Sequence, residues 1–138
     1  MLNANQKRFL RITLGVVEDV LMNLRRLLLK GEEERLFLHT VDDLTQQEKG
    51  QLVERMDRLR ENMLHLKNLF QLNPGEKSVR QMVKAASVYL AVDLEETMSD
   101  QLRGRGEIAP EIKETLDPTL EKMISVLHDM GLCVESDS

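Results

Sequence analysis

The chain has 138 residues, of which 31% are charged and 3% aromatic, and its formal net charge is −5. A chain of this length favours one domain whose core needs no disulfide to hold it. Its acidic balance argues against wholesale nucleic-acid binding, which requires a basic surface that displaces counterions from phosphates. Because Cys133 is the only cysteine, an internal disulfide and a cysteine-based zinc cluster are excluded.

Strand-forming residues are sparse, whereas Leu, Glu, Gln, Lys, Arg and Met, which favour helices, dominate the sequence. The sequence therefore predicts an all-α fold, an up-and-down antiparallel bundle of about four main helices plus a short connector helix. We expect residues 1–131 to form a single helical-bundle domain and residues 132–138 to form a loose C-terminal tail.

Membrane and export signals are weak. The longest uncharged run within a predicted helix, residues 85–92, is far shorter than the roughly 20 apolar residues that cross a bilayer. Near the N-terminus, Glu18 and Asp19 interrupt the apolar run of residues 12–17, and no small-residue cleavage site follows. We therefore expect no transmembrane segment and a cytoplasmic location.

The first predicted helix covers residues 5–30. Its apolar residues span an arc of about 200° at 100° per residue, which is wider than one neighbouring helix needs. The basic residues at its end suit the helix dipole, and Gly31 is a favourable stop. We expect this helix to contact two or more others.

Residues 31–44 are predicted to connect the first two helices. Three consecutive glutamates, residues 32–34, favour the start of a short helix that runs through Phe37. His39, Thr40 and Asp42 then end it. We expect residues 36–38, with the sequence Leu-Phe-Leu, to pack against the end of the bundle.

The second helix has the clearest start signal, because Thr45 and Glu48 have the spacing of a capping box. Its apolar residues are separated by four and three positions in alternation, which is the heptad pattern of a packed helix seam. They are Leu52, Met56, Leu59, Met63, Leu66 and Phe70. A seam of this length is typical of a helical bundle.

Asn73 and Pro74 predict the start of the third helix, as an N-cap followed by proline at the first helical position. So short a connection places the second and third helices antiparallel. The third helix is predicted to run to about Arg103, where Gly104 and Gly106 end it. Its seam consists of Val79, Val83, Ala86, Leu90 and Leu94. The alanines of this helix permit a neighbour to approach closely.

The last helix has two candidate starts, each marked by a proline. Proline inside a helix removes a hydrogen bond and clashes with the preceding turn. We therefore predict a short helical turn over residues 110–116, then a separate or kinked helix over residues 118–130 with Asp117 as its cap. Gly131 is expected to close that helix. Its seam consists of Leu120, Met123, Leu127 and Met130.

Metal and catalytic patterns do not appear in the sequence. Di-metal bundles carry a Glu-x-x-His motif on two helices, but the residues three before the histidines are Leu36, Asn62 and Ser125. No Ser/His/Asp order, glycine-rich phosphate loop or Cys/His metal spacing appears. We therefore expect a non-catalytic protein with no cofactor and no metal.

His65 supports an alternative, enzymatic interpretation. Residues 63–68, Met-Leu-His-Leu-Lys-Asn, resemble the histidine phosphotransfer and sensor-kinase dimerisation motifs, although Lys67 follows the histidine by two positions and not three. Arg60 with His65 is similar to the Arg-x4-His spacing of the helical HEPN ribonucleases. These resemblances imply phosphotransfer or RNA cleavage at His65, which helical spacing places on an exposed face.

Charge is distributed unevenly along the chain. Residues 1–90 hold 15 basic and 12 acidic side chains, a net of +3, whereas residues 91–138 hold 4 and 12, a net of −8. Six basic residues of the first helix fall within about 140°, opposite its apolar arc. They are Lys7, Arg8, Arg11, Arg25, Arg26 and Lys30. They indicate either a docking face for an acidic partner, RNA or an anionic membrane, or a solvated face that neutralises the acidic half.

Three leucines near the end of the second helix, Leu64, Leu69 and Leu72, lie off its main seam. Together with the wide arc of the first helix, they leave more apolar surface than one thin bundle buries, and a symmetric dimer would cover it. The sequence therefore favours a protein–protein interaction or adaptor module that self-associates. We expect the six basic residues of the first helix and these three leucines to carry the interaction.

Overall fold

The computed structural model describes residues 1–135, and these residues form an all-α fold. They contain five α-helices, one 3-10 turn and one sheet of two short strands. The chain divides into two compact units, Met1–Gly75 and Glu76–Ser138, where the sequence favoured one domain over residues 1–131. Each unit has its own pair of packed helices, α1 with α2 and α3 with α5.

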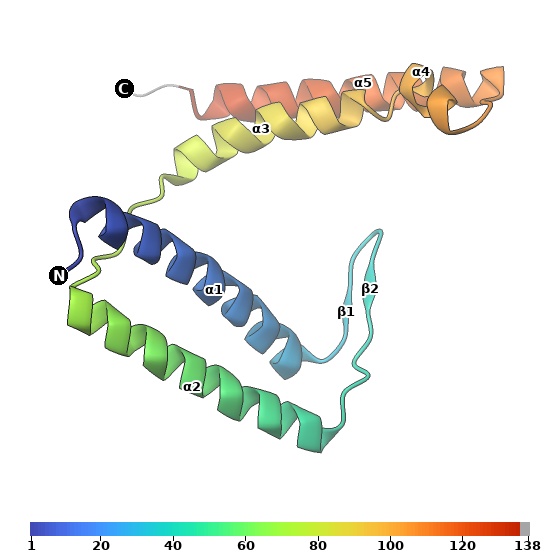
Figure 1. Ribbon diagram of the computed structural model, residues 1–138. Helices are drawn as coiled ribbons and strands as arrows, with labels where there is room; N and C mark the ends of the chain where they lie inside the picture. Colours follow the sequence, from blue (N-terminus) through green and yellow to red (C-terminus); the bar gives the residue numbers. More distant parts are fainter. Residues whose placement is uncertain (136–138) are drawn as a thin grey trace. The chain divides into compact units, whose positions relative to one another are not determined.

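The first unit is an antiparallel helix pair, drawn in blue and green in Figure 1. Helix α1 (Ala4–Lys30) is capped by Asn3 and ends at Gly31, whose φ of 80° suits a residue without a side chain. Helix α2 (Gln46–Phe70) begins at the predicted capping box. The Glu48 amide donates to the Thr45 hydroxyl at 3.1 Å, and the Thr45 amide donates to the Glu48 carboxylate at 2.9 Å.

A β-hairpin, and not the predicted connector helix, joins α1 to α2. Strand β1 (Glu33–Glu34) pairs antiparallel with strand β2 (His39–Thr40). The turn closes where the Arg35 amide donates to the Leu38 carbonyl at 2.8 Å. The run of glutamates does not start a helix because the Glu33 side chain binds two arginines, one of them on α1.

The two residues at the apex of this hairpin, Leu36 and Phe37, are 93% and 95% exposed, and the neighbouring Leu38 is also exposed. The expected packing of residues 36–38 against the end of a bundle is therefore not found. The hairpin projects from the ends of the two helices that it joins, as Figure 1 shows, so its apex lies away from both.

In the second unit, α3 (Val79–Glu95) begins later and ends earlier than predicted. Its cap is Ser78, whose hydroxyl accepts from the Gln81 amide at 3.2 Å, and not Asn73. After Glu95 the chain turns through the short α4 (Ser99–Leu102) and the 3-10 turn η1 (Arg103–Arg105). The Thr97 hydroxyl donates to the Leu94 carbonyl at 2.7 Å and so binds a group at the helix end.

Helix α5 (Pro110–Cys133) is continuous through Pro118, so of the two predicted alternatives the separate helix is not found. Asp117 does not cap a new helix, because its carboxylate accepts from the Ser99 amide at 2.9 Å and from the Ser99 hydroxyl at 2.6 Å. Because α5 extends through Cys133, the predicted tail is helical at residues 132–133. Residues 136–138 of that predicted tail lie outside the described residues.

Small residues line the contact between α3 and α5. Ser87 and Ala91 on α3 are buried, as is Leu120 on α5. Gly131 lies inside α5 and does not end it as predicted. A Cβ added at Gly131 would lie 2.8 Å from the Ser87 hydroxyl oxygen, so the glycine allows the two helices to approach closely.

Candidate functional site

The wide apolar arc of α1 resolves into two faces. Five half-buried residues point toward α2 and lie within about 80° of one another. They are Leu10, Leu14, Val17, Leu21 and Leu28. Opposite them α2 contributes the buried Met56 and the half-buried Met63, Leu66 and Phe70, which are members of the predicted seam.

A second apolar face of α1 has no cover within the first unit. Phe9, Ile12, Val16 and Val20, called here the α1 stripe, are 52–75% exposed. At 100° per residue they also lie within about 80°, centred about 130° from the face toward α2. Contiguous apolar surface of this kind marks an interaction site more often than scattered exposed residues do.

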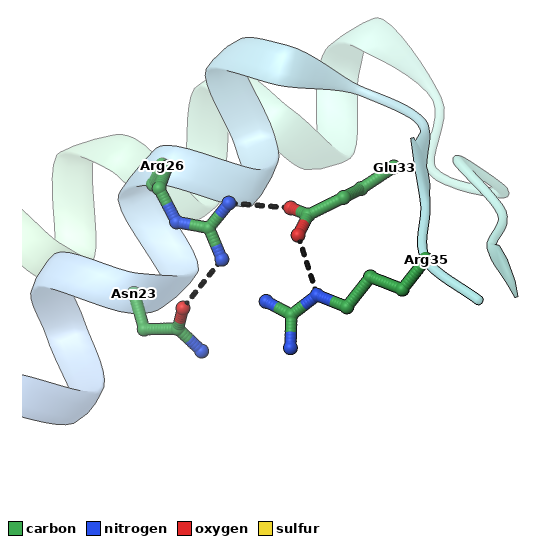
Figure 2. A network of polar contacts seen from close by, with 4 residues as sticks. All are labelled: Asn23, Arg26, Glu33 and Arg35. Atoms are coloured by element: carbon green, nitrogen blue, oxygen red, sulfur yellow. Dashed lines mark hydrogen bonds and ion pairs between the residues drawn. The ribbon is translucent and has the colours of Figure 1, made fainter. Parts of the chain in front are cut away.

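The hairpin that carries Leu36 and Phe37 is tied to α1 by a polar network, shown in Figure 2. The Glu33 carboxylate accepts from the Arg26 guanidinium and from Arg35 Nε at 2.8 Å. Arg26 also donates to the Asn23 side-chain oxygen at 2.8 Å. Hydrogen bonds from Arg26 and then Arg35 lower the pKa of Glu33 from 4.5 to about 2, so the carboxylate stays ionised at neutral pH.

The other end of the hairpin is fixed to the start of α2. Asp42 forms an ion pair with Lys49, and both side chains are largely covered. The hydrogen bond from Lys49 lowers the pKa of the Asp42 carboxyl below its ordinary value. Together with the network at Glu33, this pair holds both strands of the stem, so the hairpin presents its apex in a defined direction.

The six predicted basic residues of α1 fall into separate groups. Arg25 pairs with Asp57 of α2 and Arg26 pairs with Glu33, whereas Lys30 is exposed. These pairings neutralise part of the predicted basic face. The remaining three residues gather at the other end of the helix, around a pocket.

This pocket, called here the basic pocket, has a volume of about 280 Å³. Lys7, Arg8 and Arg11 of α1 line it, together with residues 71–73 that follow α2. The Arg11 guanidinium lies against the backbone of Gly75, where an added Cβ would be 3.6 Å from its central carbon. Three cationic side chains and no acidic one therefore surround a hollow partly lined by Leu72.

The three leucines singled out in the sequence are placed differently from one another. Leu64 and Leu69 are about half exposed on α2, whereas Leu72 is buried and lines the basic pocket. His65 and Arg60 are exposed on the same helix. No group of three or more metal-ligating side chains occurs among residues 1–135, and no helix within that range is long and apolar enough to cross a membrane.

The second unit also exposes apolar side chains, along one side of α5. Four of them lie within about 60°. They are Ile112, Met123, Val126 and Met130. Met123 and Met130 were predicted in the seam, and the structure places them at its edge, 47% and 44% exposed.

The sequence did not predict two features of the first unit, the exposed hairpin apex and the basic pocket. The apex could have been suspected from three consecutive apolar residues inside an otherwise polar connector. The pocket had no such signal, because residues 71–73 and the start of α1 meet only in the folded unit. Comparisons of the chain with protein-family models, curated proteins and solved structures find no match.

Proposed function

We propose that the protein is a non-catalytic interaction module that self-associates through the α1 stripe. The observation that carries the proposal is the row of four large apolar side chains, Phe9, Ile12, Val16 and Val20, left more than half exposed on one face of α1. A symmetric pair of chains would place the same stripe against itself, which is the usual geometry of a homodimer.

The free energy gained by burying the two stripes is close to the cost of association, which favours a reversible dimer. Full burial of one large apolar side chain contributes about 1.5–3 kcal/mol. Two stripes would cover eight such side chains, each already partly buried, for a gain of roughly half that value per residue. The total is comparable to the roughly 4–15 kcal/mol that association costs in lost freedom. The assembly is therefore expected to dissociate on dilution.

Light scattering on the full chain across a dilution series tests this proposal. The double substitution Ile12→Glu with Val16→Glu introduces charge at two exposed positions, so it leaves the packing between α1 and α2 in place. We expect a lower average mass than wild type at every concentration where wild type associates, with the apparent dissociation constant raised at least tenfold, about 1.4 kcal/mol.

Met22→Glu is the matched control. Met22 lies on α1, is 65% exposed and is about 120° from the centre of the stripe. This variant should behave as wild type. A wild-type chain that is monomeric throughout the series, or equal masses for the stripe variant and the Met22→Glu control, would contradict the proposal.

A further inference from the structure

The hairpin apex is an unusual place for apolar residues. Tight turns favour Gly, Asn and Asp, yet this one has Leu36 and Phe37 at its two central positions. Neither has a positive φ, so backbone conformation does not require a special residue there. Neither packs within the first unit, since both are more than nine-tenths exposed. A stem that is anchored at both ends thus presents two apolar side chains to the outside.

The charge around the apex restricts what can receive it. Residues 31–44 contain five acidic residues and one arginine. Glu33 and Asp42 are used in the anchoring ion pairs, whereas Glu32, Glu34 and Asp43 are exposed and have no ion pair within the described residues. The receiving surface must therefore combine an apolar hollow with a basic rim, and an anionic membrane is disfavoured.

The basic pocket of the same unit has both properties. Lys7, Arg8 and Arg11 provide three positive charges, and Leu72 provides an apolar wall. Its volume of about 280 Å³ is just below the range of roughly 300–1,000 Å³ typical of small-molecule sites, so it suits one or two side chains. The apex is thus complementary to the pocket in charge and in size.

One chain cannot fill its own pocket with its own apex. Residues 11 and 31 are separated by twenty helical residues, or about 30 Å along α1. The six steps from Gly31 to Phe37 span at most about 22 Å even when fully extended. The hairpin leaves the last turn of α1, as Figure 1 shows, whereas the pocket is lined by residues of the first turns of that helix. A contact between apex and pocket must join two copies.

We propose that the Leu36–Phe37 apex of one chain docks into the basic pocket of a second copy. This contact rests on the proposed self-association and adds a second surface to it, separate from the α1 stripe. Because apex and pocket are different surfaces, two copies either exchange apices reciprocally in a two-fold dimer or join head-to-tail. In a head-to-tail pair one copy keeps its pocket free and the other keeps its apex free, so that assembly closes into a ring or grows as a filament.

The test uses full-length chains that carry Val16→Glu and Val20→Glu, which block the α1 stripe without placing a carboxylate one helical turn from Arg8. The apex variant adds Leu36→Ser and Phe37→Ser, and the pocket variant adds Arg8→Glu and Arg11→Glu. Sedimentation velocity should show oligomers for the stripe-blocked parent and monomers for each variant alone. An equimolar mixture should form a one-to-one heterodimer and nothing larger, because only one intact apex and one intact pocket remain.

Leu29→Ser in the same stripe-blocked chain is the matched control, since Leu29 is 84% exposed at the end of α1 but outside the hairpin. It should associate as its parent does, whereas the apex variant should lose at least tenfold in affinity. The heterodimer should also weaken as salt rises, because its rim contacts are ionic.

Two results would overturn the contact between the apex and the pocket of a second copy. One is a mixture that stays monomeric at every concentration while each variant remains folded by circular dichroism. The other is flotation of the parent, but not of the apex variant, with phosphatidylcholine vesicles, which would assign the apex to lipid. Neither result affects the α1 stripe, which is tested separately in chains with an intact hairpin.

Discussion

The two units join antiparallel helices in opposite ways. In the first unit the connector projects outward, with Leu36 and Phe37 exposed at its apex and its polar groups used to anchor the stem. In the second unit the connector is held inward. Ser99 at the start of α4 is 1% exposed and is bound by Asp117 of α5. The comparison indicates that the second connector stabilises its unit, whereas the first leaves its apex exposed for the contact proposed above.

The two units also differ in the size of the side chains that pack between their helices. The second unit brings α3 and α5 together through Ser87, Ala91 and Gly131, whose small side chains permit close backbone approach. The first unit pairs α1 with α2 through long side chains such as Met56 and through the Arg25–Asp57 ion pair. A seam of long side chains adapts to change more readily than a seam of small ones.

The largest expected losses of stability come from truncating one buried side chain in each helix pair, α3 with α5 and α1 with α2. Leu120→Ala in the second unit removes a buried side chain from a close contact, and we expect a loss of about 3 kcal/mol because the neighbours cannot collapse into the cavity. Met56→Ala in the first unit should cost less, about 2 kcal/mol, because flexible neighbours refill the space. Denaturant unfolding followed by circular dichroism measures both. Equal losses would remove this distinction between the units.

Two glycine substitutions should change the free energy of unfolding by smaller amounts, one stabilising the chain and the other destabilising it. Gly15 lies within α1 with open space around its Cβ position, so Gly15→Ala should stabilise the chain by about 0.5–1 kcal/mol through helix propensity. Gly131→Ala brings a methyl group against Ser87 and should destabilise the chain by about 1 kcal/mol.

Adding Ser87→Ala to Gly131→Ala should recover most of that loss, because it removes the clashing oxygen. Thermal unfolding of the four chains measures these differences. If Gly131→Ala were as stable as Gly15→Ala, the close approach of α3 and α5 would be refuted.

Acid titration gives the smallest effect and compares the two connectors. Hydrogen bonds from Arg26 and Arg35 lower the pKa of Glu33 to about 2, and hydrogen bonds from Ser99 lower the pKa of Asp117. A carboxyl with a lowered pKa stabilises the fold fully above its ordinary value, and this contribution is lost as the pH falls towards the folded value. Both connectors should therefore be intact at neutral pH, the first weakening below about pH 4.5 and the second below about pH 3.8.

Carbon-13 NMR of the side-chain carboxyls would follow both groups separately. Arg26→Gln should move the titration of Glu33 upward, towards 4.5, and leave that of Asp117 unchanged. If Arg26→Gln left the midpoint of Glu33 where it was, the network that anchors the hairpin would be absent in solution.

The sequence predicted those features that depend on neighbouring residues. The all-α class, the capping box at Thr45 and the stop at Gly31 each follow from a few adjacent side chains, and all three are confirmed. The wide arc of α1 predicted contact with two or more other helices, whereas within the first unit only α2 packs against α1 and the rest of the arc is exposed. Its division into a packed face and an exposed stripe needed the position of α2.

Features that depend on distant contacts could not be predicted. Asp117 followed by proline is a strong local signal for a helix start, but Ser99, eighteen residues earlier, binds the carboxylate and α5 continues. The glutamates at residues 32–34 favour a helix start, but Arg26 and Arg35 draw Glu33 into a hairpin. The basic residues of α1 were predicted to form one face. Arg25 pairs with Asp57 and Arg26 pairs with Glu33, so the face is separated into parts.

The boundary at Gly75 has a spectroscopic consequence. All three phenylalanines of the chain, Phe9, Phe37 and Phe70, lie in the first unit, whereas the only tyrosine, Tyr89, lies in the second, and the chain has no tryptophan. Tyrosine emission therefore reports on the second unit alone, and the fine structure of phenylalanine absorption reports on the first. The wild-type chain carries a separate optical probe for each unit, so the unfolding of the two can be followed in one sample without a label.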